Sequence, residues 1–89
     1  MLRIGIIGDY DASNPTHPAT TAALEEAAQA LGEALQARWF GTAQLGADAT
    51  ILAGCDAIVA SPGSPYADFL GALAAIQYAR LQQIPFLGT

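Results

Sequence analysis

Short apolar runs that alternate with helical patterns limit most strongly what this chain can fold into. The first run, residues 2–8, is rich in isoleucine and closes on glycine, which is typical of a strand buried on both faces. Residues 55–61 and 84–87 have the same character, and proline or glycine stands beside or within each. Residues 35–42 alternate imperfectly between apolar and polar side chains, and we interpret them as a further strand.

Helical patterns fill the stretches between these runs. His17 precedes Pro18 at an early helical position, and Gly32 is the natural stop of the helix that follows. Its apolar side chains at helical spacing are Ala23, Leu24, Ala27 and Leu31. A second helix within residues 66–83 is expected to carry Phe69, Leu73 and Ile76 on one stripe. We also expect a short helix around residues 48–52.

The order of these elements predicts the fold class. Strands that alternate with helices through short loops form a parallel sheet with right-handed crossovers and helices on both faces. The sequence therefore predicts an α/β, flavodoxin-like, three-layer arrangement with about four parallel strands and two to three helices, as one domain over residues 1–89.

Composition excludes several classes of function. The chain is 53% hydrophobic and only 12% charged, so we expect it to fold. Its net charge is −5 and its basic residues, Arg3, Arg38 and Arg80, are scattered, so no nucleic-acid partner is expected. No apolar stretch reaches the roughly 18 residues of a membrane span and no leader is visible, so we expect a cytoplasmic protein without a membrane partner. One cysteine and one histidine predict neither a disulfide nor a metal site, and we expect no cofactor.

In a fold of this class the ligand lies beyond the carboxyl ends of the strands. Candidate side chains that line a site there are Asp9, His17 and Tyr66. Neither a G-x-G-x-x-G fingerprint nor a P-loop is present, which disfavours a flavin or nucleotide binder. Asp9 and Asp11 resemble the acidic pair of a phosphoacceptor domain, but the third strand ends in Ser61 rather than in an aspartate. We therefore expect both acids to be solvated turn residues.

The two most reactive residue types have structural interpretations. His17 has the only side chain that titrates near neutral pH when unperturbed, yet beside Pro18 we expect it to be a helix-start residue. Cys55 precedes the third strand, at the amino end of the sheet, so a buried structural thiol is expected there. The loop "SPGSPY" can present backbone N–H groups to an oxyanion. A plain turn uses the same residue types, and these residue types by themselves favour the turn.

Taken together, these segments resemble class I glutamine amidotransferase domains of the CTP synthase type. The resemblance covers the whole chain through "IGIIGDY", "NPTHPATTAAL", "CDAIVASPGSPY", "GALAAIQYAR" and "IPFLGT". In that family a cysteine thiolate attacks the side-chain amide of glutamine, a histidine held by a carboxylate relays protons, and backbone N–H groups stabilise the oxyanion. The resemblance implies that Ser64 supplies one such N–H, with Gly63 giving the backbone room to approach.

The same resemblance makes Gly88 and Thr89 the first residues of the nucleophile elbow, G-x-C-x-G. Where CTP synthase has a second glycine this chain has Ser64, and Pro65 after it carries no N–H. The nucleophile would follow Thr89, so we expect the chain as given to be inactive on glutamine. Because some stand-alone relatives carry selenocysteine at the nucleophile position, we expect selenocysteine or cysteine next in the native protein.

An alternative interpretation makes the chain a non-catalytic α/β binding or assembly module. Under either interpretation the fourth strand ends as an apolar edge, and such edges drive association. We therefore expect a homodimer or a domain-swapped oligomer.

Overall fold

The computed structural model describes residues 1–61 and 67–88 of the chain. Its elements in chain order are β1 (Leu2–Ile7), α1 (Thr16–Ala30), β2 (Leu35–Phe40), α2 (Thr42–Ala47), the 3₁₀ turn η1 (Ala49–Leu52), β3 (Ala57–Ala60), α3 (Phe69–Leu81) and β4 (Phe86–Gly88). The predicted order of strands and helices is confirmed.

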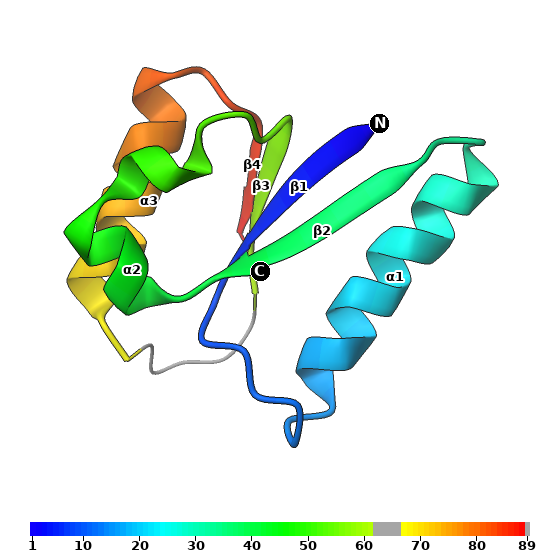
Figure 1. Cartoon of the computed structure of the whole chain (residues 1–89), viewed down its shortest axis with the longest axis horizontal. Helices are drawn as coiled ribbons and strands as arrows, with labels where there is room; N and C mark the ends of the chain where they lie inside the picture. The colour runs from blue at the N-terminus through cyan, green and yellow to red at the C-terminus, as the bar shows by residue number, and fades with distance from the viewer. Residues whose placement is uncertain (62–66, 89) are drawn as a thin grey trace.

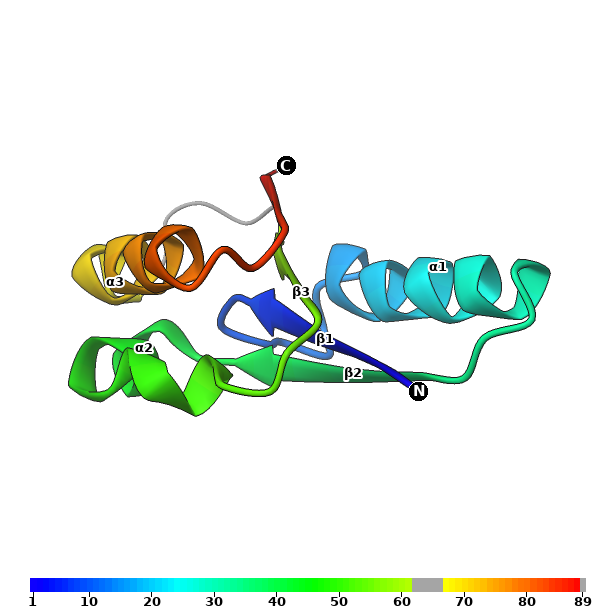
Figure 2. The same ribbon diagram turned by 90° about the horizontal axis from the view of Figure 1, so that it is seen from above.

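The four strands form one parallel sheet in the order β2-β1-β3-β4. Helix α1 covers one face of the sheet, and α2 and α3 lie together on the other, as Figures 1 and 2 show. The strand order reverses beside β1, as it does in flavodoxin-like folds. The expected three-layer α/β architecture is therefore confirmed.

Alternation along the strands divides the core between the two faces. Ile7, Phe40 and Ile58 pack with Leu45, Leu52 and the alanines of α3 on the side of α2 and α3. Ile4 and Ile6 point to the opposite face, because successive side chains alternate along a strand, and both are buried. Burial on both faces explains why residues 2–8 read as a continuous apolar run.

The second predicted strand was too long and one helix was missed. Strand β2 ends at Phe40, and Thr42 is already the first residue of α2. The helix expected around residues 48–52 is the 3₁₀ turn η1. Helix α2 is only six residues long and ends in Gly46 and Ala47. It is therefore too short for a periodic pattern of apolar side chains to appear in the sequence.

The apolar stripe predicted for α1 was wrong. Leu31 is 77% exposed and Ala23 and Ala27 also face solvent, whereas Ala28 and His17 are buried. Of the four predicted residues only Leu24 is partly buried. One of the two buried residues of α1 is His17, and a prediction based on the spacing of apolar side chains does not consider histidine.

The stripe predicted for α3 was also wrong, for a different reason. Phe69 is 64% exposed and Leu73 44%, while the buried side is made of small residues. These are Gly71, Ala72, Ala75 and Ala79. A Cβ atom on Gly71 would lie 1.8 Å from the carbonyl oxygen of Thr42, so the small residues let α3 approach α2 closely. Large side chains are left on the outer face.

Candidate functional site

The carboxyl ends of β1 and β2 and the start of α3 are joined by one carboxylate, that of Asp9. Its Oδ1 accepts hydrogen bonds from the backbone N–H of Thr42 (2.9 Å) and from Thr42 Oγ1 (3.0 Å). Its Oδ2 accepts from the backbone N–H of Ala67 (2.9 Å) and lies 2.9 Å from the same Thr42 hydroxyl. The Gly41 N-cap of α2 has no side chain, so Asp9 serves as the cap from another segment.

Thr42 extends this network to the start of α3. Its side chain is fully buried, and its Oγ1 accepts a hydrogen bond from the backbone N–H of Asp68 at 2.8 Å. Asp68 in turn caps α3, since its Oδ1 accepts from the N–H of Gly71 at 3.1 Å. The starts of α2 and α3 and the loop after β1 are thereby fixed relative to one another.

Asp9 is held ionised at this junction. Burial raises its pKa, but the hydrogen bonds from Ala67 and Thr42, together with the charge of His17, outweigh burial and leave the pKa below the ordinary value. Since both oxygens already accept hydrogen bonds, Asp9 is suited to positioning the loops rather than to transferring protons.

Asp9 and Asp11 were both expected to be solvated turn residues, and this prediction is confirmed for Asp11 only. Asp11 is exposed, and its Oδ1 accepts hydrogen bonds from the N–H and hydroxyl of Ser13, which is the expected turn chemistry. Asp9 is instead partly buried and binds residues far along the chain. Its partner Thr42 was expected at the same edge of the sheet, but no role was assigned to it from the sequence. The available signal was that both residues follow the carboxyl ends of adjacent parallel strands.

His17 is a buried residue in the first turn of α1, as expected for a helix-start position. Its Nδ1 accepts a hydrogen bond from the backbone N–H of Asp11 at 2.9 Å. The ring packs against Trp39, with centroids 4.9 Å apart, and against Tyr10 at 5.9 Å. Trp39 Nε1 donates to Thr21 Oγ1, which fixes the indole under α1. These contacts make His17 a support of the loop after β1.

Cys55 lies just before β3, at the amino end of the sheet, as predicted. Its thiol is half-buried rather than fully buried. Burial and the nearby charge of Asp56 raise the pKa of the thiol, against the smaller opposing effects of Arg38 and Arg3. The thiol is therefore neutral at pH 7 and is remote from the junction at Asp9.

The described residues on either side of the segment predicted to form the oxyanion hole, Ser61 and Ala67, are hydrogen-bonded to Ile7 and Asp9. The N–H of Ser61 donates to the carbonyl oxygen of Ile7 at 3.0 Å, and the N–H of Ala67 donates to Asp9. Both flanks of residues 62–66 are thus attached to the carboxyl end of β1. The predicted site residues Gly63, Ser64, Tyr66 and Thr89 lie outside the described residues, and Gly88 ends β4 beside Ala60 of β3.

No group of three or more histidine, cysteine, aspartate or glutamate side chains placed to hold a metal ion is found in residues 1–61 and 67–88. In the same part of the chain, none of the helices combines the length and apolar character needed to cross a membrane.

Comparisons of the sequence and of the fold with known proteins both find CTP synthases. No protein-family model matches the chain. The CTP synthase of Trichormus variabilis is 40% identical over 89 residues, which cover 98% of this chain and 16% of that protein. The CTP synthase of Thermosynechococcus vestitus is 37% identical with the same coverage. The chain therefore spans about one sixth of the length of these relatives.

Among solved structures, the glutaminase domain of the Trypanosoma brucei CTP synthase with bound acivicin superposes with a TM-score of 0.84. It is 26% identical in sequence and matches 99% of this chain and 36% of that one. Sequence and fold agree on the same relatives. Over essentially its whole length the chain is similar in sequence to CTP synthases, and its fold matches part of the glutaminase domain of the Trypanosoma brucei enzyme.

Proposed function

We propose that this chain forms the amino-terminal portion, residues 1–89, of a glutamine-hydrolysing domain that supplies ammonia to a synthetase. The observation that carries the proposal is the anchoring of both flanks of residues 62–66 to β1, through Ile7 and Asp9. The two described flanks, Ser61 and Ala67, therefore lie at the carboxyl edge of the parallel sheet, which is where ligands bind in folds of this class.

In this proposal the substrate is glutamine, and each predicted residue keeps its role. Ser64 donates a backbone N–H to the oxyanion and Gly63 lets the backbone approach. Gly88 and Thr89 begin the nucleophile elbow, and Asp9, His17 and Tyr66 line or support the site. The position of β4 beside β3 supports the elbow assignment, because Gly88 then reaches the same sheet edge as Ala60.

The 89 residues by themselves are proposed not to hydrolyse glutamine. Their single cysteine, Cys55, lies at the opposite end of the sheet and has a raised pKa, so it is not an activated nucleophile. The nucleophile is proposed to be selenocysteine or cysteine in the position after Thr89. A purely non-catalytic module is not favoured, because the homologues that span the chain are CTP synthases.

The test is to sequence the gene beyond the codon for Thr89, through any in-frame UGA. The proposal predicts an in-frame continuation that encodes the remainder of a G-x-C-x-G-like elbow, a histidine and a glutamate. A reading frame without these residues would contradict the proposal.

We also propose that the 89-residue chain associates with a second copy. Strand β4 is an edge of the sheet, with Phe86 37% and Leu87 60% exposed. On α3, Leu70 (74%) and Leu81 (72%) are exposed, and Leu81 borders a shallow groove together with Leu73, Ile76, Gln77 and Arg80. Apolar surface and open strand edges of this kind are buried by self-association.

Light scattering across a concentration series tests the association. We expect a dimer or swapped pair at high concentration, and a shift toward monomer in a Leu70→Gln, Leu81→Gln double variant. Ala23→Gln, an exposed change on α1, is the matched control and should leave the mass unchanged. A wild-type monomer at all concentrations contradicts the proposal.

The cytoplasm is the proposed location. Cys55 is a free thiol, and unpaired cysteines suit a reducing compartment. Cell fractionation tests this location: recovery of the protein in the cytosolic fraction supports it, and recovery with membranes or in the medium contradicts it.

A further inference from the structure

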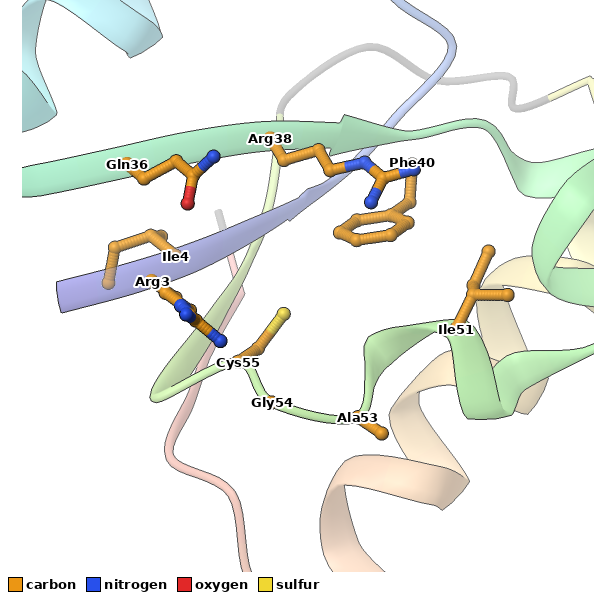
Figure 3. A pocket seen from close by; sticks show the side chains of 9 residues that line it. All are labelled: Arg3, Ile4, Gln36, Arg38, Phe40, Ile51, Ala53, Gly54 and Cys55. Carbon is orange, nitrogen blue, oxygen red and sulfur yellow. The ribbon is translucent and has the colours of Figure 1, made fainter.

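A hollow of about 160 Å³ lies at the amino end of the sheet, far from the junction at Asp9. It is bordered by β1, β2 and the connection from η1 to β3, and Figure 3 shows its side chains. Those used below are Arg3, Gln36, Arg38, Phe40 and Cys55. Neither the glutamine site nor the association proposed above makes use of this hollow.

The parallel register places these polar groups on one face of the sheet. Arg3 is paired with Gln36, and Gly5 with Arg38, so all three long side chains project to the side of α2 and α3. Gly5 lets Cys55 and Phe40, which line the hollow, pack closely onto the sheet. A Cβ atom there would lie 3.0 Å from Cys55 Sγ and 3.2 Å from the Phe40 ring.

The charge of the hollow is opposite to that of the chain. The chain has three basic and eight acidic residues, yet two of the three basic ones meet here. Asp56 is the neighbouring acid, and its Oδ2 accepts from the backbone N–H of Arg3 at 2.8 Å. Among the described residues, no ion pair is formed by the guanidinium of Arg3 or Arg38. Two like charges on adjacent strands are unfavourable unless an anion lies between them.

The remaining groups prepare the hollow for an anion. The Arg38 guanidinium lies 5.0 Å from the centroid of the Phe40 ring, and this cation–π contact holds it over the hollow. The raised pKa of Cys55 keeps its thiol uncharged, so it does not repel a negative ligand. Gln36 adds an amide that can donate a hydrogen bond.

We propose that this hollow binds a small tetrahedral oxyanion, inorganic phosphate or the phosphate group of a monoester, between Arg3 and Arg38. The fork of N–H donors on each guanidinium matches the oxygens of a phosphate, and two guanidiniums balance its double charge. The volume of 160 Å³ is that of about five water molecules at about 30 Å³ each, which is enough for the five heavy atoms of phosphate.

Cys55 provides the readout, because it is the only cysteine in the chain and it borders the hollow. The full chain is alkylated with neutral iodoacetamide at constant ionic strength, with phosphate replacing chloride. The proposal predicts that phosphate slows alkylation saturably, by about fivefold or more, since the bound ion covers the thiol. β-Glycerophosphate as the added ion tests the monoester: equal protection identifies a phosphate-group site, and protection by phosphate alone identifies a site for the free ion.

The variants Arg3→Gln and Arg38→Gln should each weaken phosphate binding by about tenfold or more, since each removes a charge-assisted contact. Arg80→Gln is the matched control, because Arg80 is the third arginine and lies on α3 away from the hollow. Protection no greater than that given by acetate, or an equal loss in Arg80→Gln, would overturn the proposal.

A second measurement on the unaltered chain does not depend on variant folding. In a titration with phosphate, the backbone amide signals of Gly5, Gly54 and Cys55 in a two-dimensional NMR spectrum should shift with the affinity found by alkylation. If these three signals do not shift, or if signals shift equally over the whole chain, the proposed phosphate site is contradicted.

Discussion

Asp9 is the residue whose role the structure changes most. Its partners Thr42 and Ala67 lie 33 and 58 positions away in the chain. No local pattern of residues can reveal the distant partners of this carboxylate, so the sequence predicted a turn residue and a candidate site-lining side chain there, but not the junction. By contrast, the positions of His17 and Cys55 followed correctly from Pro18 and from the strand order, which are local signals.

The substitution Asp9→Asn should lower the free energy of unfolding by about 2 kcal/mol, because an amide cannot accept from all the donors that surround both oxygens. Urea denaturation measures this change. Asp11→Asn is the control and should cost less than about 0.5 kcal/mol, since asparagine serves equally in such a turn. Equal losses in the two variants would show that the junction is not held by Asp9.

The lowered pKa of Asp9 gives a pH dependence with a definite sign. The unfolded chain has the ordinary aspartate pKa of about 3.9 and binds the proton first, so the contribution of Asp9 is complete above that pH. It is lost as pH falls through the lower folded value. Between pH 5 and 3, unfolding free energy should therefore fall more steeply in the wild type than in Asp9→Asn. Parallel curves would contradict this assignment.

The contact between α2 and α3 shows what element-level patterns miss. The sequence indicated α3 by its large apolar side chains and did not indicate α2, yet α3 packs through Gly71, Ala72 and Ala75. Alanine carries little weight in a periodicity search, while the close approach of two helices requires small residues. Strands were easier to predict, because burial on both faces makes them apolar throughout.

Gly71→Ala tests this contact. Alanine favours a helix by about 1 kcal/mol over glycine, but its Cβ would meet the Thr42 carbonyl, so we expect a net loss of about 2 kcal/mol in unfolding free energy. Gly46→Ala is matched to it, because there the Cβ meets the Asp68 side chain rather than backbone, and the cost of displacing this cap of α3 is offset by the higher helix propensity of alanine. That variant should change stability by less than about 0.5 kcal/mol. The same loss in both would show that the close approach is unimportant.

At the scale of the whole molecule, the parallel sheet separates two kinds of chemistry. Its carboxyl edge holds the junction of Asp9, Thr42 and Ala67, and its amino edge holds the arginine-lined hollow with Cys55. The fold class could be predicted because local residue patterns along the whole chain indicate the alternation of strands and helices. The two edges could be only partly predicted, since each is assembled from segments that are distant in sequence.

The most direct test of the glutaminase assignment is ammonia release from glutamine by the protein made from its complete reading frame. The account predicts activity that survives Cys55→Ala, because this thiol lies at the amino edge, and that falls in Asp9→Asn, because the hydrogen bonds from Thr42 and Ala67 are weakened. An activity that Cys55→Ala abolishes and Asp9→Asn leaves intact would contradict the account and place the chemistry at the opposite end of the sheet.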